Sequence, residues 1–312
     1  MILITGATGF VGRAVVRRLA VEGREVCCLL RPSRREQRLP TDILFSSVSA
    51  SMDDLPALRA AMQGVTAVVH LTGEADLEQD RRLDHHADDT ANLLEATREA
   101  GVRRLVYLSR LGANPASAYP LFRALGEAEA AVRESGLDIT ILQAAVTYGP
   151  EDTFTNVLAM LGKTIPLLLP IPDPGQSRFQ PLWVMDLVRC VVDTLNRDDL
   201  IGQTVLIGGP EHFTFEQLLM EVLAAVGVRR RLVRVRPPLM RGAIALGEAL
   251  LPRGPTPCWW LDLLTVGSAT DLVTVQRHFG FAPCRFADCL DYLGRKRPWR
   301  RDLLRFAFHR LA

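Results

Sequence analysis

Residues 2 to 12 read Ile2-Leu3-Ile4-Thr5-Gly6-Ala7-Thr8-Gly9-Phe10-Val11-Gly12, a short apolar run followed by three glycines spaced three apart. The apolar run predicts a buried strand over 2–5, and the periodicity that follows predicts a helix over 10–22. A side chain at Gly6 or Gly9 would obstruct such a turn or hold a ligand away from its backbone, and one at Gly12 would push the helix away from the strand. The segment therefore predicts the first strand, turn and helix of a doubly wound α/β fold.

The same alternation continues through the first half of the chain. Strands are expected over 25–30, 42–46, 66–71, 104–109 and 138–142, and helices over 53–62, 84–100 and 120–135. Glycines that can end a helix stand between these segments, at Gly23, Gly64, Gly101 and Gly136. Alternating strands and helices predict a parallel sheet that is covered by helices on both faces, as in a Rossmann domain.

After Pro150 the pattern is looser, and the stretch up to 181 is expected to be largely proline-rich loop. Further helices are expected near 185–196, 214–226, 239–250 and 271–279, and strands near 203–207 and 232–235. We expect a dinucleotide-binding Rossmann domain over 1–150, a small α+β substrate or partner lobe over 151–294 packed on it, and a basic amphipathic tail over 295–312.

Composition excludes several protein classes. The 312 residues are 48% hydrophobic and 23% charged, as in ordinary globular proteins and unlike disordered or collagen-like chains. The longest apolar runs, 165–171 and 243–251, are shorter than a membrane-spanning helix requires. Because an apolar strand follows Met1 directly, no signal peptide is expected. The predicted location is the cytoplasm, with a peripheral location at the inner face of a membrane as a further possibility.

Cysteines and histidines do not predict a metal site. The six cysteines include no C-x-x-C pair, so reduced cysteines with packing roles are expected. His85 and His86 lie near several aspartates, and a solvated helix start is favoured there over a metal site. Asp186 opens an apolar helical run and is interpreted as a helix N-cap or a solvated acid.

The glycine turn and the end of the second strand predict the cofactor. A strand that enters a helix through such a turn presents backbone amides and the positive end of the helix dipole to a phosphate. An acid after the second strand would suit the ribose hydroxyls of NAD, but Arg31 stands there, followed by Arg34, Arg35 and Arg38. Guanidinium groups suit the additional phosphate that distinguishes NADP(H) from NAD(H), so NADP(H) is the predicted cofactor. The alternative is that these arginines form a solvated basic loop. The residues expected to bind it are Thr5, Gly6, Thr8, Gly9, Phe10, Val11, Gly12, Arg31, Arg35, His70, Leu71, Thr72, Gly73, Ser109 and Ala144.

Further motifs extend over nearly the whole chain. They are His70-Leu71-Thr72-Gly73, Tyr148-Gly149-Pro150, residues 178–192 and Phe279-Gly280-Phe281-Ala282-Pro283. With the glycine turn, they resemble the extended and atypical short-chain dehydrogenase/reductases. Residues 101–109, followed by Leu111-Gly112-Ala113-Asn114-Pro115, resemble the branch that contains the nucleotide-binding accessory subunit of respiratory complex I. The resemblance implies a Rossmann sheet with a small C-terminal lobe and NADP(H) across the carboxyl ends of the strands.

The catalytic residues that this resemblance implies are incomplete. The family uses a tyrosine and a lysine four residues later on one helix face. Tyr119 and Arg123 occupy these positions and are the candidate catalytic residues, although a solvent-facing tyrosine at a helix start is the alternative. The family serine or threonine aligns with Leu111, two residues from Ser109. The Tyr292 to Lys296 match to the same pattern is interpreted as accidental.

The tail 295–312 carries seven basic residues and one acid, together with leucines and phenylalanines. If the tail forms a helix, its apolar and basic residues lie on different sides. An amphipathic helix of this kind can lie on an anionic membrane surface or dock onto a larger protein complex. A terminal helix packed on its own protein is the alternative, and nucleic acid is not expected as a partner because no reader module is present.

Two classes of function follow from these features. The first is an NADP(H)-binding, weakly catalytic or non-catalytic accessory or assembly component of a respiratory or membrane-associated complex. The second is an NADP(H)-dependent oxidoreductase that reduces a small apolar carbonyl or quinone-like substrate, with Tyr119 as the proton donor.

Overall fold

The computed structural model describes residues 1–32, 39–71, 83–172, 177–250, 259–294 and Trp299. The chain forms two compact units. The first consists of Met1–Ala144, Val184–Ile207 and Thr274–Phe281, and the second of Ala145–Trp183, Gly208–Val273 and Ala282–Ala312. Arg35, Thr72, Gly73 and, apart from Trp299, the tail 295–312 lie outside the described residues.

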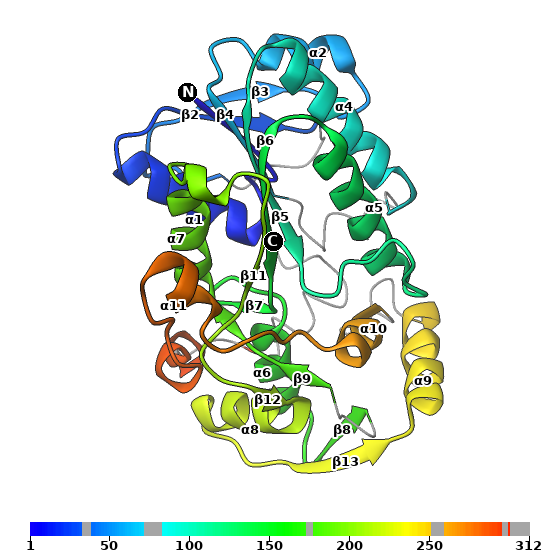
Figure 1. Ribbon diagram of the computed structural model, residues 1–312. Coiled ribbons are helices and arrows are strands. Elements are labelled where there is room, and N and C mark those ends of the chain that lie inside the picture. The colour runs from blue at the N-terminus through cyan, green and yellow to red at the C-terminus, as the bar shows by residue number, and fades with distance from the viewer. Residues whose placement is uncertain (33–38, 72–82, 173–176, 251–258, 295–298, 300–312) are drawn as a thin grey trace. The chain divides into compact units, whose positions relative to one another are not determined.

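The first unit is built on a seven-stranded sheet (Figure 1), which confirms the predicted doubly wound α/β fold. Its strands are β1 (Ile2–Thr5), β2 (Val26–Leu30), β3 (Ser46–Ser49), β4 (Ala67–Leu71), β5 (Arg104–Arg110), β6 (Asp138–Ala144) and β11 (Thr204–Ile207). They lie in the order β11-β6-β5-β4-β1-β2-β3, and every neighbouring pair is parallel. The order reverses beside β1, where doubly wound sheets bind ligands at the carboxyl ends of their strands.

Strand β3 corrects one expected boundary. A strand was expected over 42–46, but the structure pairs Ser46–Ser49 with Cys27–Leu30 at the edge of the sheet. Three of its four residues are exposed, and the apolar Leu44 before it is 95% exposed. An edge strand with little buried surface leaves no apolar alternation in the sequence, so the apolar run was not a guide to its position.

Helices cover both faces of the sheet (Figure 1). They are α1 (Phe10–Val21), α2 (Leu55–Ala61), α4 (His86–Glu99), α5 (Pro120–Glu134), α7 (Val184–Thr194) and α11 (Thr274–Phe279), with short 3-10 turns at Leu83–His85 and Asp198–Leu200. Helix α1 packs with α7, and α4 packs with α5. Asp186 lies within the first turn of α7 rather than at its N-cap, which corrects the first of its two expected roles.

The second unit combines helices with three two-stranded ribbons, β10–β7, β12–β9 and β13–β8. Its elements are β7 (Thr147–Tyr148), α6 (Thr155–Thr164), β8 (Leu168–Pro172), β9 (Arg178–Phe179), β10 (Leu182–Trp183), β12 (Phe213–Thr214), α8 (Phe215–Ala225), β13 (Arg231–Val235), α9 (Pro237–Leu250), α10 (Trp259–Val266) and 3-10 turns at Ala287–Cys289 and Asp291–Gly294. Helices α6 and α10 were not predicted. In α6, Val157, Leu158 and Met160 are buried, which explains a helix where loop was expected.

Two buried polar networks hold the second unit together. The amide of Gln180 donates to the Gly209 carbonyl at 2.6 Å and accepts from the Thr270 amide at 2.7 Å. The Asp152 carboxyl accepts from Thr155 at 2.5 Å and from the Tyr292 hydroxyl at 3.2 Å. Burial raises the pKa values of both Asp152 and Tyr292. Tyr292 therefore belongs to the framework of this unit.

The cysteines differ in part from the expectation that all are reduced. Cys27, Cys28 and Cys190 are free and buried, as packing residues would be. Cys284 and Cys289 are joined by a disulfide, so the expectation of reduced cysteines is wrong for this pair; the two are five residues apart, a spacing on which the absence of a C-x-x-C pair has no bearing.

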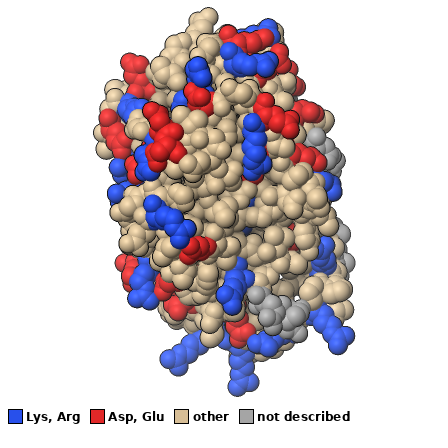
Figure 2. Space-filling model, viewed as in Figure 1, with Lys and Arg blue, Asp and Glu red and all other residues tan. Residues whose placement is uncertain are grey.

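Charged side chains of both signs are interspersed over most of the face shown in Figure 2. Several form exposed ion pairs, for example Arg103 with Asp138 at 3.1 Å and Arg197 with Asp199 at 2.6 Å. Exposed pairs of this kind contribute about 0–1 kcal/mol each, so the fold rests on its apolar core.

Candidate functional site

The glycine turn between β1 and α1 has no room for side chains at two of its glycines. Gly6 has φ +70°, and a Cβ added to it would lie 1.7 Å from the carbonyl oxygen of Leu71. A Cβ added to Gly12 would lie 2.1 Å from the Gly6 carbonyl oxygen. The turn is therefore pressed against the end of β4 and against the first turn of α1, which leaves the backbone accessible to a phosphate.

The start of α1 leaves amide donors available. Gly9 is the N-cap, its amide donates to the Gly6 carbonyl at 3.0 Å, and no side chain caps the helix. The first-turn amides, including those of Phe10 and Val11, therefore lack partners within the helix. Arg13 donates a hydrogen bond to the Thr8 carbonyl and ties the turn to the helix. This cradle fits a pyrophosphate by shape and by electrostatics.

Beside the turn, register brings three polar side chains into line across neighbouring strands. Thr5 of β1 pairs with His70 of β4, and His70 pairs with Tyr107 of β5. The Thr5 hydroxyl lies 2.5 Å from Nδ1 of His70, and Nε2 of His70 lies 3.4 Å from the hydroxyl of Thr90 on α4. These side-chain contacts hold Thr5, the last residue of β1, in place just before Gly6.

Helix α4 adds a second histidine to this cluster. His86 is 2% exposed, and its Nε2 lies 3.2 Å from the Tyr107 hydroxyl. The expectation of a solvated helix start at His85 and His86 is therefore wrong for His86, because this side of α4 packs against the sheet. Burial is the main cause that lowers the pKa of His70 to about 3 and that of His86 to about 4, so both are neutral near pH 7.

Arg31 follows β2 directly and is half-buried. Its positive charge contributes, after burial, to the lowered pKa values of His70 and His86. The guanidinium is therefore close enough to act on the polar cluster at the end of β4. That location is compatible with contact to the adenosine end of a dinucleotide.

The carboxyl ends of β5 and β6 hold the remaining expected cofactor contacts. Ser109 is 6% exposed, and its hydroxyl has no hydrogen-bond partner in the part of the chain that the structure describes. Ala144 ends β6 and is buried; its carbonyl accepts from the Leu111 amide at 2.9 Å. A buried hydroxyl without a protein partner at a strand end suits a bound ligand.

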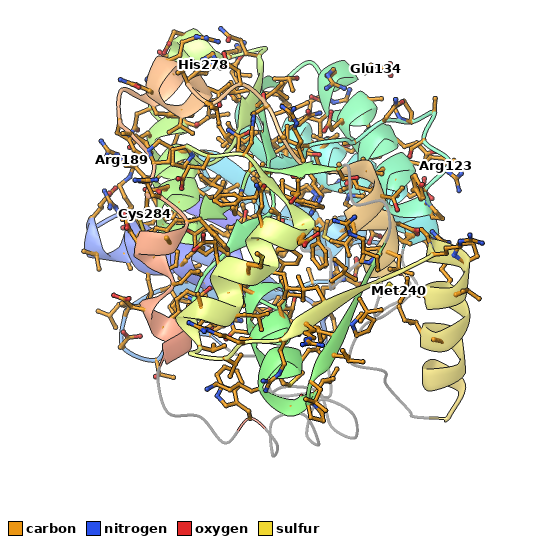
Figure 3. The ribbon with its side chains drawn as sticks, turned by 90° about the horizontal axis from the view of Figure 1, so that it is seen from below. Arg123, Glu134, Arg189, Met240, His278 and Cys284 are labelled. Carbon is orange, nitrogen blue, oxygen red and sulfur yellow. A yellow bond between two sulfur atoms is a disulfide. The ribbon has the colours of Figure 1, made fainter. Side chains whose placement is uncertain are left out.

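Tyr119 and Arg123 are not joined into a catalytic pair. Tyr119 is the N-cap of α5, half-exposed, and its ring meets Phe122 edge-on at a centroid distance of 6.4 Å. Arg123 is exposed and projects outward (Figure 3). The Arg123 amide donates to the Tyr119 carbonyl at 3.0 Å, as helix geometry requires, but within the described ranges its side chain has no hydrogen bond or ion pair that would couple its charge to the tyrosine.

The motif from Leu111 to Pro115 has a packing role. A Cβ added to Gly126 of α5 would lie 2.2 Å from the backbone nitrogen of Pro115. The Asn114 amide donates to the Phe122 carbonyl at 2.9 Å, and the Asn114 side chain accepts from the Ala116 amide at 2.9 Å. This segment is thereby held against α5, which positions Tyr119 at the start of the helix.

Sequence reasoning missed three residues of this region: Arg13, His86 and Tyr107. Nothing in the local pattern marks them, because each acquires its role through a partner on another element or in the turn. Among the described residues, no group of three or more His, Cys, Asp or Glu is placed to hold a metal ion. No described helix has the length and apolar character needed to cross a membrane.

Comparisons with known proteins give consistent results. The family model described as NAD(P)H-binding matches residues 6–163, about half of the chain. NADH dehydrogenase [ubiquinone] 1 alpha subcomplex subunit 9 from Arabidopsis thaliana is 30% identical over 266 residues, which cover 81% of this chain and 65% of that protein. The chain therefore spans less than two thirds of that relative. Sterol demethylase protein B from Methylococcus capsulatus is 29% identical and is covered over 96% of its length, by 92% of this chain.

Solved structures share the fold at low identity. The dTDP-glucose 4,6-dehydratase from Streptomyces venezuelae, solved with NAD bound, has a TM-score of 0.73 at 21% identity, covering 100% of this chain and 99% of that one. UDP-glucose 4-epimerase from Thermotoga maritima has a TM-score of 0.71 at 20% identity, covering 97% of this chain and 99% of that one. At these identities the likeness shows the fold alone.

Proposed function

Because this chain belongs to the NAD(P)H-binding family, we propose that it binds NADP(H) and acts as an accessory or assembly component of a larger complex, with weak or no hydride transfer. One observation carries the proposal: the glycine turn is complete, whereas Arg123 faces outward where a catalytic lysine would be needed. These two features support cofactor binding without an efficient proton-transfer pair.

The turn would hold the pyrophosphate through its backbone at Gly6, Gly9 and Gly12. Arg31 would bind the additional phosphate of NADP, because a guanidinium offers two parallel donors to phosphate oxygens. Titration of NADPH and NADH against the wild type and Arg31→Ala tests this assignment. We expect about ten- to hundredfold weaker NADPH binding in the variant, from the loss of charge-assisted hydrogen bonds, and little change for NADH.

Arg98→Ala is the matched control, because Arg98 is an exposed arginine on α4. Unchanged NADPH affinity in Arg31→Ala would show that Arg31 does not contact the cofactor. Tighter binding of NADH than of NADPH by the wild type would overturn the cofactor preference.

Hydride transfer is proposed to be weak because Arg123 faces outward and gives Tyr119 no side-chain support. When bound, the nicotinamide supplies a hydride; the chain's own task is to give a proton, and Tyr119 is its donor. A lysine at position 123 is a compact, flexible charge that could approach the hydroxyl, whereas the arginine fork is rigid. We therefore expect Arg123→Lys to raise NADPH oxidation above that of the wild type across a carbonyl library.

Membership of a complex is supported by the similarity to the mitochondrial NADH dehydrogenase subunits. The tail 295–312 would provide the contact to partner subunits or to an anionic membrane surface. The protein would then be located at the periphery of the membrane. Purification of the tagged full chain from its natural source, compared with a version that ends at Gly294, tests this. Subunits recovered only with the full chain are the expected result; identical recoveries would contradict it.

A second function is a reductase of a small apolar carbonyl. Two observations favour it: the buried hydroxyl of Ser109, which has no hydrogen-bond partner among the described residues, and the nearly full-length alignment with sterol demethylase protein B. In this case Tyr119 would protonate the carbonyl oxygen. NADPH oxidation by the wild type with sterol ketones or quinones, lost in Tyr119→Phe, would establish this function in place of the first.

A further inference from the structure

One surface of the second unit has no role in the site described above. It is formed by the ribbon of β8 and β13 and by the start of α9. We call it the ribbon surface and define it by its exposed residues, Leu167, Leu168, Arg229, Arg231, Val233, Arg236 and Leu239. Figure 1 draws β8, β13 and α9 of the second unit, and Figure 2, in the same view, shows Lys or Arg side chains projecting where Figure 1 draws β13.

Strand register gives the ribbon an apolar outer face. In the parallel pairing, Leu168 lies beside Arg231, and Pro170 lies beside Val233. Registered neighbours share a face and alternate residues point to opposite faces, so these four side chains form one side of the ribbon. All four are exposed, whereas Leu169 and Ile171, on the opposite face, are buried. The outer face therefore presents aliphatic side chains together with an arginine.

Leu167 departs from ordinary backbone geometry. It is the one described residue other than glycine with a positive φ, 63°, and the residue is 80% exposed. An L-residue with a bulky side chain is strained in this conformation, which glycine would adopt freely. The position therefore keeps an exposed leucine at a cost to stability, and strain of this kind is a reason to look for function.

The charge of this region is one-sided. Residues 226–247 contain six arginines and no acid. Three of these have partners: Arg234 pairs with Glu216 at 3.0 Å, Arg241 pairs with Asp262, and Arg230 donates to the Ile165 carbonyl at 2.9 Å. Arg229, Arg231 and Arg236 are exposed, and their side chains have no ion pair within the described ranges. Their charge is therefore left for a partner.

We infer that the ribbon surface binds the surface of an anionic lipid bilayer. Arginines among exposed leucines and valine match a headgroup region, where cations meet lipid phosphates and aliphatic side chains enter the acyl boundary. The surface lacks the aromatic side chains with which single-stranded nucleic acids stack. This membrane contact is independent of the tail 295–312.

Sedimentation of the full chain with vesicles of phosphatidylglycerol and phosphatidylcholine, or of phosphatidylcholine alone, tests the inference. We expect salt-sensitive binding to the anionic vesicles only. The triple variant Arg229→Gln/Arg231→Gln/Arg236→Gln should bind them roughly a hundredfold more weakly, at about fivefold per arginine near a charged surface.

Leu167→Gly separates docking from folding. It removes the exposed side chain and the backbone strain together, so the melting temperature should stay equal or rise while vesicle affinity falls about tenfold. A purely structural role for Leu167 would not lower vesicle binding in a protein that has become no less stable.

Two matched triple variants complete the design. Arg17→Gln/Arg98→Gln/Arg103→Gln makes the same change in net charge on the first unit and should leave vesicle binding unchanged. Arg300→Gln/Arg301→Gln/Arg305→Gln makes it in the tail, and binding retained by this variant assigns the contact to the ribbon surface.

The inference is overturned if the wild type ignores anionic vesicles, or if the ribbon variants bind as the wild type does. It is also overturned if only the tail variant loses binding, or if polyglutamate or RNA competes for the arginines while Leu167→Gly has no effect. A failure of the ribbon variants leaves the tests of NADP(H) binding untouched, so the two proposals can fail separately.

Discussion

The hydroxyl of Thr5 and Nδ1 of His70 lie 2.5 Å apart, which links the last residue of β1 to β4 immediately before the glycine turn. Thr5→Val keeps the shape of the side chain but leaves a buried imidazole nitrogen without this partner. We expect a loss of about 1–3 kcal/mol in the free energy of unfolding, measured with urea, and weaker dinucleotide binding. Thr66→Val, which removes an exposed hydrogen bond to Met1, is the control. Equal stability of Thr5→Val and wild type would contradict the assigned role.

The buried histidines predict a pH dependence of stability. Their pKa values are lowered to about 3 for His70 and about 4 for His86, mainly by burial. Below about pH 6.5 both histidines take up a proton in the unfolded chain but stay neutral in the native chain. The free energy of unfolding is therefore unaffected by them above that pH, and it decreases as the pH falls toward 4. At pH 5 the loss is about 2 kcal/mol for each histidine.

Urea unfolding at pH 7 and pH 5 measures this difference. His70→Gln/His86→Gln keeps hydrogen-bonding groups that do not titrate, and should show a smaller loss between the two pH values. The same loss in variant and wild type would show that other groups cause it.

Gly6→Ala should abolish dinucleotide binding and destabilise the first unit, because its Cβ would overlap the Leu71 carbonyl oxygen. Gly23→Ala is a matched control: its φ is +71°, close to the +70° of Gly6, but a Cβ there meets nothing within 4 Å. The control should cost only the backbone strain, about 1–2 kcal/mol. Similar melting temperatures for the two variants would show that the close approach of the turn to β4 is not as described.

Two helical glycines should respond to alanine with opposite signs. Gly126→Ala would place a Cβ 2.2 Å from the Pro115 nitrogen and should destabilise the protein by several kcal/mol, with displacement of the segment from Leu111 to Pro115. Gly242→Ala on α9 meets nothing within 4 Å and should stabilise the protein by about 0.5–1 kcal/mol. Thermal unfolding compares them, and a tolerated Gly126→Ala would refute the packing role.

Most elements of the sheet could be predicted because their signals are local. The apolar runs that became β1, β4 and β6 and the helical periodicity of α1 and α5 each depend on neighbours a few residues away. The return of Thr204–Ile207 to pair with β6 depends on contacts about 60 residues apart along the chain, and its short apolar run does not specify its neighbour.

In the candidate site, the sequence by itself determined the glycine turn. The spacing of Gly6, Gly9 and Gly12 is a backbone requirement, and no other residue type meets it at Gly6 and Gly12. Tertiary structure alone decided that His86 is buried against Tyr107 and that Arg123 faces outward. Which side of a helix is buried depends on how that helix packs, so the polar cluster and the outward position of Arg123 became visible only in the folded chain.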